Sequence, residues 1–89
     1  MNADDRWSMA LFVAEIDGET DAEARLTKAD SRNFSGRGKA KLNPADQDVG
    51  MIGEEIAIAR ALSDLSHKLL HSAAVGVESM THDKARLHR

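Results

Sequence analysis

The stretch ARALSDLSHKLL, from Ala59 to Leu70, is the centre of the only long helical pattern in the sequence. Its apolar residues recur at intervals of three and four, the spacing of one face of an α-helix. The pattern extends from Ile52 to Ala73, and Gly76 is predicted to end the helix. The residues ahead of this stretch have the pattern of β-strands whose sheet must be covered by another element. We therefore expect the helix to cover that sheet and complete a small α+β domain.

The apolar arc of this predicted helix covers about half of its circumference, which is more than one sheet face requires. Its members are Ile52, Ile56, Ile58, Ala59, Leu62, Leu65, Leu69, Leu70 and Ala73. The surplus predicts packing on Trp7 and the C-terminal segment, or on a second subunit. The opposite face is predicted to be solvated, with an ion-pair ladder at a spacing of four residues; it carries Arg60, Asp64, His67, Lys68 and His71. Residues 77–80 fit either a final helical turn or an edge strand.

Three strands are predicted ahead of the helix, at Trp7 to Ile16, Thr20 to Thr27 and Phe34 to Leu42, with a tight turn at residues 17–19. The first strand is apolar on both faces, which is typical of a strand buried on both. Its Phe12 face is therefore either covered by a partner chain or left in solvent. The predicted fold is a three-stranded antiparallel sheet covered by one long C-terminal helix, in a single domain over residues 1–89 whose ends, 1–5 and 83–89, fray.

The second predicted hairpin has an inner face of small residues and a charged outer face. Gly36 and Gly38 weaken a strand, and close approach of a helix is the usual reason for glycine there. On the outer face, an antiparallel register places acidic residues across from basic ones, Asp21 from Lys39 and Glu23 from Arg37.

Composition excludes several classes of function. The 89 residues include no cysteine, which rules out disulfides, thiolate metal sites and cysteine nucleophiles. No signal peptide and no apolar run of ~18 residues is present, so we expect a cytoplasmic protein without membrane contact. No Ser/His/Asp arrangement predicts an activated nucleophile, and one helix on a small sheet leaves little room for a pocket. We therefore expect no enzyme, no catalytic residue, no cofactor and no small-molecule substrate.

His67 and His71 are the strongest candidates for a metal site. They stand four residues apart on one predicted helix face, a spacing that can chelate zinc. Asp64, or His82 or His88 folding back, would have to supply a third ligand. A solvated helix face is the favoured interpretation, so no metal site is predicted.

Basic residues gather in the second hairpin, between Arg25 and Lys41, where Asp30 is the single acid. Contact with RNA phosphates is the functional interpretation, and the candidate nucleic-acid-binding residues are Arg25, Arg32, Arg37, Lys39 and Lys41. The alternative is that Glu23 and Asp21 neutralise Arg37 and Lys39 across the sheet. The net charge of −3 provides no overall attraction to RNA, so only such a local surface would bind it.

The chain resembles a family of small actinobacterial proteins of unknown function. The resemblance is carried by three segments, LNPADQDV (42–49), IGEEIAIARALSDLSHKLL (52–70) and ESMTHDKARL (78–87). This resemblance implies a β-β-β-α fold related to the double-stranded-RNA-binding domain without its first helix, and a homodimer. It also implies a link to dormancy and low-oxygen stress, and a likeness to ribosome hibernation-promoting factors. Where relatives have proline and acid ahead of Ile52, this chain has Gly50 and Met51.

Two hypotheses about function follow. The first is a non-enzymatic stress or dormancy factor that contacts ribosomes or structured RNA through the basic hairpin. The start of the helix, which carries Asp46, Asp48, Glu54 and Glu55, would repel phosphate. The second hypothesis is a homodimeric protein-interaction module with no nucleic-acid role.

Overall fold

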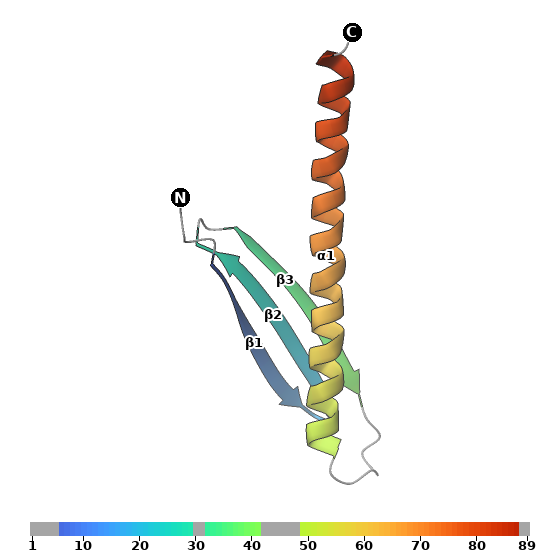
Figure 1. Cartoon of the computed structure of the whole chain (residues 1–89). Helices are drawn as coiled ribbons and strands as arrows, with labels where there is room; N and C mark the ends of the chain where they lie inside the picture. The colour runs from blue at the N-terminus through green and yellow to red at the C-terminus, as the bar shows by residue number, and fades with distance from the viewer. Residues whose placement is uncertain (1–5, 30–31, 42–48, 88–89) are drawn as a thin grey trace.

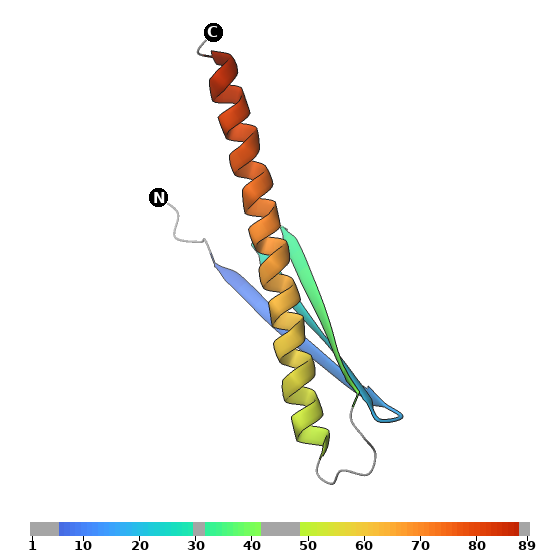
Figure 2. The ribbon, with the colours of Figure 1, turned by 90° about the vertical axis from the view of Figure 1, so that its right-hand side faces the viewer.

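The computed structural model describes residues 6–29, 32–41 and 49–87. Strands β1 (Trp7–Ile16), β2 (Glu19–Lys28) and β3 (Asn33–Lys41) form an antiparallel sheet in the order β1-β2-β3, and helix α1 (Val49–Leu87) follows. The helix lies across one face of this sheet (Figures 1 and 2). The predicted α+β class and strand order are confirmed. Asp46 and Asp48, which the sequence places at the start of the helix, lie outside the described residues.

The turn between β1 and β2 fixes the hydrogen-bonding pattern of the whole sheet. Asp17 and Gly18 have φ angles of 52° and 78°, and Ile16 pairs directly with Glu19. Two turn residues with positive φ define a type I′ hairpin, whose flanking residues form a hydrogen-bonded pair. By alternation, even-numbered residues of β1 bond to β2, and odd-numbered residues direct their N–H and C=O groups to the open edge.

Helix α1 is longer than the sequence predicts. It runs for 39 residues, about 58 Å at 1.5 Å per residue, and its C-terminal half projects past the sheet (Figure 1). The prediction that Gly76 ends the helix is wrong, and residues 77–80 are helical, so the edge-strand alternative is excluded. An interior glycine costs a helix only about 1 kcal/mol, and no turn or proline follows Gly76 to end it.

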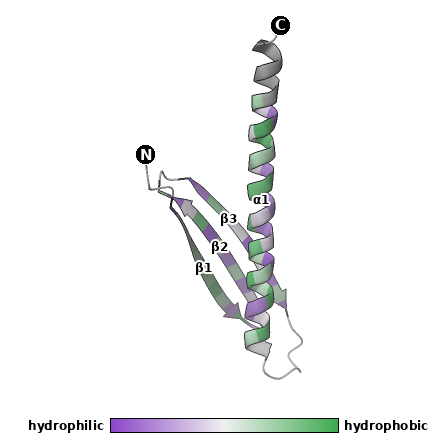
Figure 3. Ribbon diagram, in the orientation of Figure 1, coloured by the Kyte–Doolittle hydropathy of each residue, from purple (hydrophilic) through white to green (hydrophobic). Residues whose placement is uncertain are grey.

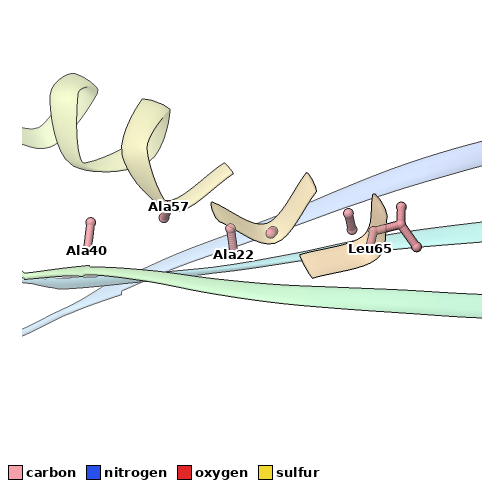
Figure 4. Packing of buried hydrophobic residues seen from close by; sticks show 6 residues of the cluster. Ala22, Ala40, Ala57 and Leu65 are labelled. Carbon is pink, nitrogen blue, oxygen red and sulfur yellow. The ribbon is translucent and has the colours of Figure 1, made fainter. Parts of the chain in front are cut away.

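The core between sheet and helix consists of small side chains. Its buried members are Ala22, Ala24, Ala40, Ala57, Ala61 and Leu65. Figure 4 shows Ala22 and Ala40 projecting from the sheet toward the helix, which contributes Ala57 and Leu65. Because alanine occupies most of these positions, the helix backbone lies close to the strands.

Gly36 and Gly38 permit the closest approach between helix and sheet. A Cβ atom on Gly36 would lie less than 3.0 Å from the Ala61 carbonyl oxygen, and one on Gly38 equally close to that of Ala57. These distances are shorter than any ordinary carbon contact, so the prediction of close approach is confirmed. The two glycines place the helix over β2 and β3, and β1 is left outside its cover.

Candidate functional site

Helix side chains cover the outer edge of β3 by bonding to its backbone. Arg60 Nη1 donates to the Lys39 carbonyl (2.7 Å), the Arg37 N–H donates to Asp64 Oδ2 (2.9 Å), and Lys68 Nζ donates to the Ser35 carbonyl (2.9 Å). The donors and acceptors of an edge strand are otherwise a template for pairing with another chain. This edge of the sheet is therefore occupied within the subunit.

The spacing of these contacts follows from the geometry of the two elements. Four residues along a helix advance about 6 Å, and two residues along an antiparallel strand advance about 6.8 Å. Helix and strand run in opposite directions, so each step of four in α1 meets a step of two in β3. The sequence prediction of a solvated ladder is only partly right. Lys68 and Asp64 form an ion pair (3.1 Å), but Arg60 bonds to β3 instead of Asp64.

Asp64 is the centre of this contact. The hydrogen bond from the Arg37 backbone is the main cause that holds the pKa of the Asp64 carboxyl below its ordinary value of 3.8. The hydrogen bond from Lys68 acts in the same direction, and partial desolvation opposes both. The carboxylate is thus stabilised in its charged form where the helix meets β3.

Strand β1 is exposed along its whole length, on both faces. Leu11 pairs with the buried Ala24 and so lies on the helix side of the sheet, yet it is 45% exposed. Phe12, on the other side, is 50% exposed. Hydrophobic colour follows β1, whereas hydrophilic bands interrupt β2 and β3 (Figure 3). The sequence predicted that no element of the subunit itself covers the Phe12 face; the exposure of the helix-side face was not predicted.

The backbone edge of β1 is open as well. The odd-numbered residues from Trp7 to Glu15 direct their N–H and C=O groups away from β2, and no hydrogen bond within the described segments reaches them. Trp7 itself stacks on Phe34 of β3, with ring centroids 6.3 Å apart. One edge of the sheet is therefore covered by helix side chains, and the other presents both apolar side chains and free backbone groups.

Four of the five candidate nucleic-acid-binding residues lie on the outer face of the sheet, spread along β2 and β3. They are Arg25 on β2 and Arg37, Lys39 and Lys41 on β3; Arg32 lies in the connection between these strands. The side chains of Arg37 and Lys39 are 79% and 72% exposed. This surface faces away from the helix, so α1 does not shield it.

Acidic neighbours partly neutralise the same surface. Glu23 pairs with Arg25 (3.2 Å) and Arg37 (4.0 Å), and the Arg25 hydrogen bond is the main cause that lowers the pKa of Glu23. Lys39 pairs with Glu19 (3.6 Å) and not with Asp21, although Asp21 is its register partner as predicted. Of the two cross-strand pairs in the alternative interpretation, Glu23 with Arg37 is present at 4.0 Å, and Lys39 pairs with Glu19 in place of Asp21.

The candidate metal ligands predicted from the sequence are His67 and His71 on α1. His67 Nδ1 lies 2.9 Å from the Ser63 carbonyl, a hydrogen bond that needs the proton on Nδ1. No group of three metal-ligating side chains is found in the described parts of the chain. Helix α1 is not apolar enough to cross a membrane along its described length.

These features define a small α+β protein with a β-β-β-α fold and an uncovered first strand. The chain belongs to the Rv2632c-like family, whose model matches residues 5–86. This confirms the resemblance to an actinobacterial family of unknown function, since the relatives below come from mycobacteria.

Two uncharacterized proteins of Mycobacterium tuberculosis illustrate the similarity. MT1780 is 42% identical over 81 residues, which cover 91% of this chain and 85% of MT1780. Rv2632c is 46% identical over 72 residues, which cover 81% of this chain and 76% of Rv2632c. The crystal structure of Rv2632c matches with a TM-score of 0.78 at 43% identity, covering 86% of this chain and 90% of that one.

Proposed function

We propose that the chain is a non-enzymatic cytoplasmic protein that acts by binding protein, and that its partner is a second copy of itself. The observation that carries this proposal is the contrast between the two edges of the sheet. The edge of β3 is covered by Arg60, Asp64 and Lys68, whereas β1 is uncovered at its edge and on both faces. An open, apolar edge strand attracts other strands, and folds normally cover or charge it.

Hydrophobic burial supplies the driving force for such pairing. Burying a large aliphatic or aromatic side chain is worth roughly 1.5–3 kcal/mol relative to leaving it in water. The large side chains exposed on β1 are Trp7, Met9, Leu11, Phe12, Val13 and Ile16. In contrast, the intramolecular core is mostly alanine, so much of the hydrophobic surface of the subunit stays available for a partner.

Light scattering coupled to gel filtration tests self-association. We expect the mass of two subunits for the native chain and of one subunit for Leu11→Lys. Leu70→Lys is the matched control, because Leu70 is exposed on the projecting part of α1 and should leave the mass unchanged. A single-subunit mass for the native chain throughout a dilution series would contradict the proposal.

A second candidate function is binding of ribosomes or other structured RNA by a stress or dormancy factor. It is favoured by the exposure of Arg37 and Lys39, whose ion pairs are open to solvent and therefore weak. Phosphates can therefore compete for these side chains. The likeness to the double-stranded-RNA-binding domain and to hibernation-promoting factors, which the family resemblance implies, supports the same candidate.

Co-sedimentation with ribosomes across a salt series tests this second candidate. Binding through phosphates weakens steeply with salt because counterions are released. We expect Arg37→Gln with Lys39→Gln to reduce binding. Ser66→Glu with Ser72→Glu is the control, because it lowers the net charge equally on the helix, which covers the other face of the sheet. Absence of co-sedimentation of the native chain at low salt would exclude this second candidate. An equal loss of ribosome binding in the two double variants would exclude it as well.

A further inference from the structure

We infer that the outer face of the sheet carries a site for one unpaired base of single-stranded RNA, in a hollow beside Phe12. The base stacks on the Phe12 ring, and the phosphates on either side of it lie against the basic side chains of β3. This inference rests on the second candidate function, because it uses the same basic surface and specifies the form of RNA that the surface binds. It does not depend on self-association.

The hollow beside Phe12 is open to solvent and has a volume of about 330 Å³. This volume is at the lower end of the range found for small-ligand pockets. The space exists because Ala14, the next residue of β1 on this face, is too small to fill the area beside the aromatic ring. The outer-face side chains that line the hollow are Phe12, Ala14, Asp21, Glu23, Arg37 and Lys39.

The Phe12 ring is held in place from one side only. The Arg25 guanidinium lies over the ring, 4.9 Å from its centroid, and donates two hydrogen bonds to Glu23 (3.2 and 3.3 Å). Arg25 is the register partner of Ala10, whereas the hollow borders Ala14, on the opposite side of Phe12 along β1. One face of the ring therefore meets Arg25, and the other faces the hollow. Such an aromatic face stacks on nucleobases.

Basic side chains follow the hollow along β3. Arg37, Lys39 and Lys41 alternate on the outer face, and two residues along an antiparallel strand advance about 6.8 Å. Successive phosphates of an extended RNA strand are a similar distance apart, so an RNA strand parallel to β3 meets one cation at each phosphate. The ion pairs of Arg37 and Lys39 are open to solvent, and Lys41 has no ion pair among the described residues.

Asp21 adds a hydrogen-bond acceptor to the hollow. Its side chain is exposed, and it has no ion pair or hydrogen bond within residues 6–29, 32–41 and 49–87, because its register partner Lys39 pairs with Glu19 instead (3.6 Å). A carboxylate accepts a hydrogen bond from the amino group of cytosine. Uracil has no amino group, so we expect the hollow to favour cytosine over uracil.

The same surface is unsuited to duplex RNA as a base-binding site. Bases in a duplex are stacked on each other, whereas an unpaired base can be splayed out and stacked on an aromatic side chain. A second hollow, of about 280 Å³, is bordered on the outer face by Arg25, Asn33 and Ser35. The guanidinium plane of Arg25 can also stack on a base. The outer face therefore has room for a second unpaired nucleotide.

Fluorescence anisotropy with short labelled RNAs at low salt tests this site in the full chain. We expect a single strand of mixed sequence to bind more tightly than the duplex of the same sequence. Phe12→Ala should weaken single-strand binding about fivefold or more, and Phe12→Trp should retain it. Ile16→Ala is the matched control, because it shortens an exposed apolar side chain on the same face of β1 but outside the hollow. Circular dichroism checks that each variant folds.

The choice of base is a separate measurement. Oligocytidine should bind more tightly than oligouridine, and Asp21→Ala should reduce the ratio of the two affinities, even though removal of a negative charge raises both. Equal affinities of the native chain for the two oligonucleotides would overturn the role of Asp21.

The remaining outcomes separate the base site from phosphate binding. An equal effect of Phe12→Ala and Ile16→Ala, or equally tight binding of single strand and duplex, would overturn the base site and leave the second candidate function intact. Absence of binding to every RNA at low salt would overturn both.

Discussion

The backbone N–H of Arg37 donates a hydrogen bond to Asp64 Oδ2 at 2.9 Å, which joins the middle of the helix to the outer edge of β3. The contact gives one carboxylate two partners, since Lys68 also pairs with it at 3.1 Å. The helix is therefore fixed to the sheet by hydrogen bonds along one side and by close packing of the helix face that meets the strands.

Replacing this carboxylate should loosen the edge of β3. We expect Asp64→Ala to lower the melting temperature and to speed hydrogen exchange of the Arg37 amide, because that N–H loses its acceptor. Glu78→Ala, at an exposed position of α1, is the matched control and should change neither. An Arg37 amide that exchanges at the native rate in Asp64→Ala would show that the bond is not maintained in solution.

Acid should weaken the same contact. The pKa of Asp64 is lowered in the folded protein, so its contribution to stability is complete above the ordinary value of 3.8 and is lost as the pH falls through the lower, folded value. Thermal unfolding measured between neutral and strongly acidic pH should show a smaller acid-dependent loss in Asp64→Asn than in the native chain. Equal losses in the two proteins would assign the acid sensitivity to other carboxylates.

The two strand glycines should tolerate no side chain. We expect Gly36→Ala to destabilise the fold by about 1–3 kcal/mol, because the new methyl group meets the Ala61 backbone and the helix must move away. Gly76→Ala is the opposite case, with nothing within 4 Å of the added carbon. It should raise helix content, with a gain of up to about 1 kcal/mol in helix propensity. Urea unfolding and circular dichroism measure both effects; equal behaviour of the two variants would contradict the close approach.

The projecting part of α1 should be the least stable helical segment. Leu69 is the last helix residue packed against the core, and residues 70–80 are exposed. Helical segments without tertiary packing are marginal in water. We expect amides after Gly76 to exchange much faster than those near Ala61, and a chain ending after Ala74 to keep its sheet. Slow exchange throughout residues 76–80 would mean that this part of the helix is covered in solution.

Local pattern predicted much of the fold. A run apolar on both faces predicted the first strand, alternation predicted the second and third, and Gly36 and Gly38 indicated close packing of the helix. The helix was wrongly predicted to end at Gly76, because a glycine is a weak signal for helix termination when no turn-forming residues follow it. The predicted bounds of β1 match the structure, and those of β2 and the start of β3 differ from it by one residue.

The contact between α1 and β3 could not be read from the sequence. Residues at a spacing of four, such as Arg60 and Asp64, normally indicate an exposed ladder, and their bonds to β3 depend on how the helix crosses the sheet. The same holds for the basic surface, where Lys39 meets Glu19 instead of its register partner. The number of charges was evident, but their pairing depends on side-chain conformations.

The alanine core has a thermodynamic consequence. Only Leu65 among its buried members is a large side chain, so folding of one subunit gains little from burial compared with what remains exposed on β1. If that surface is buried between copies, folding and assembly become linked by mass action. The melting temperature then rises with protein concentration, and the subunit has no single intrinsic stability apart from the amount of protein present.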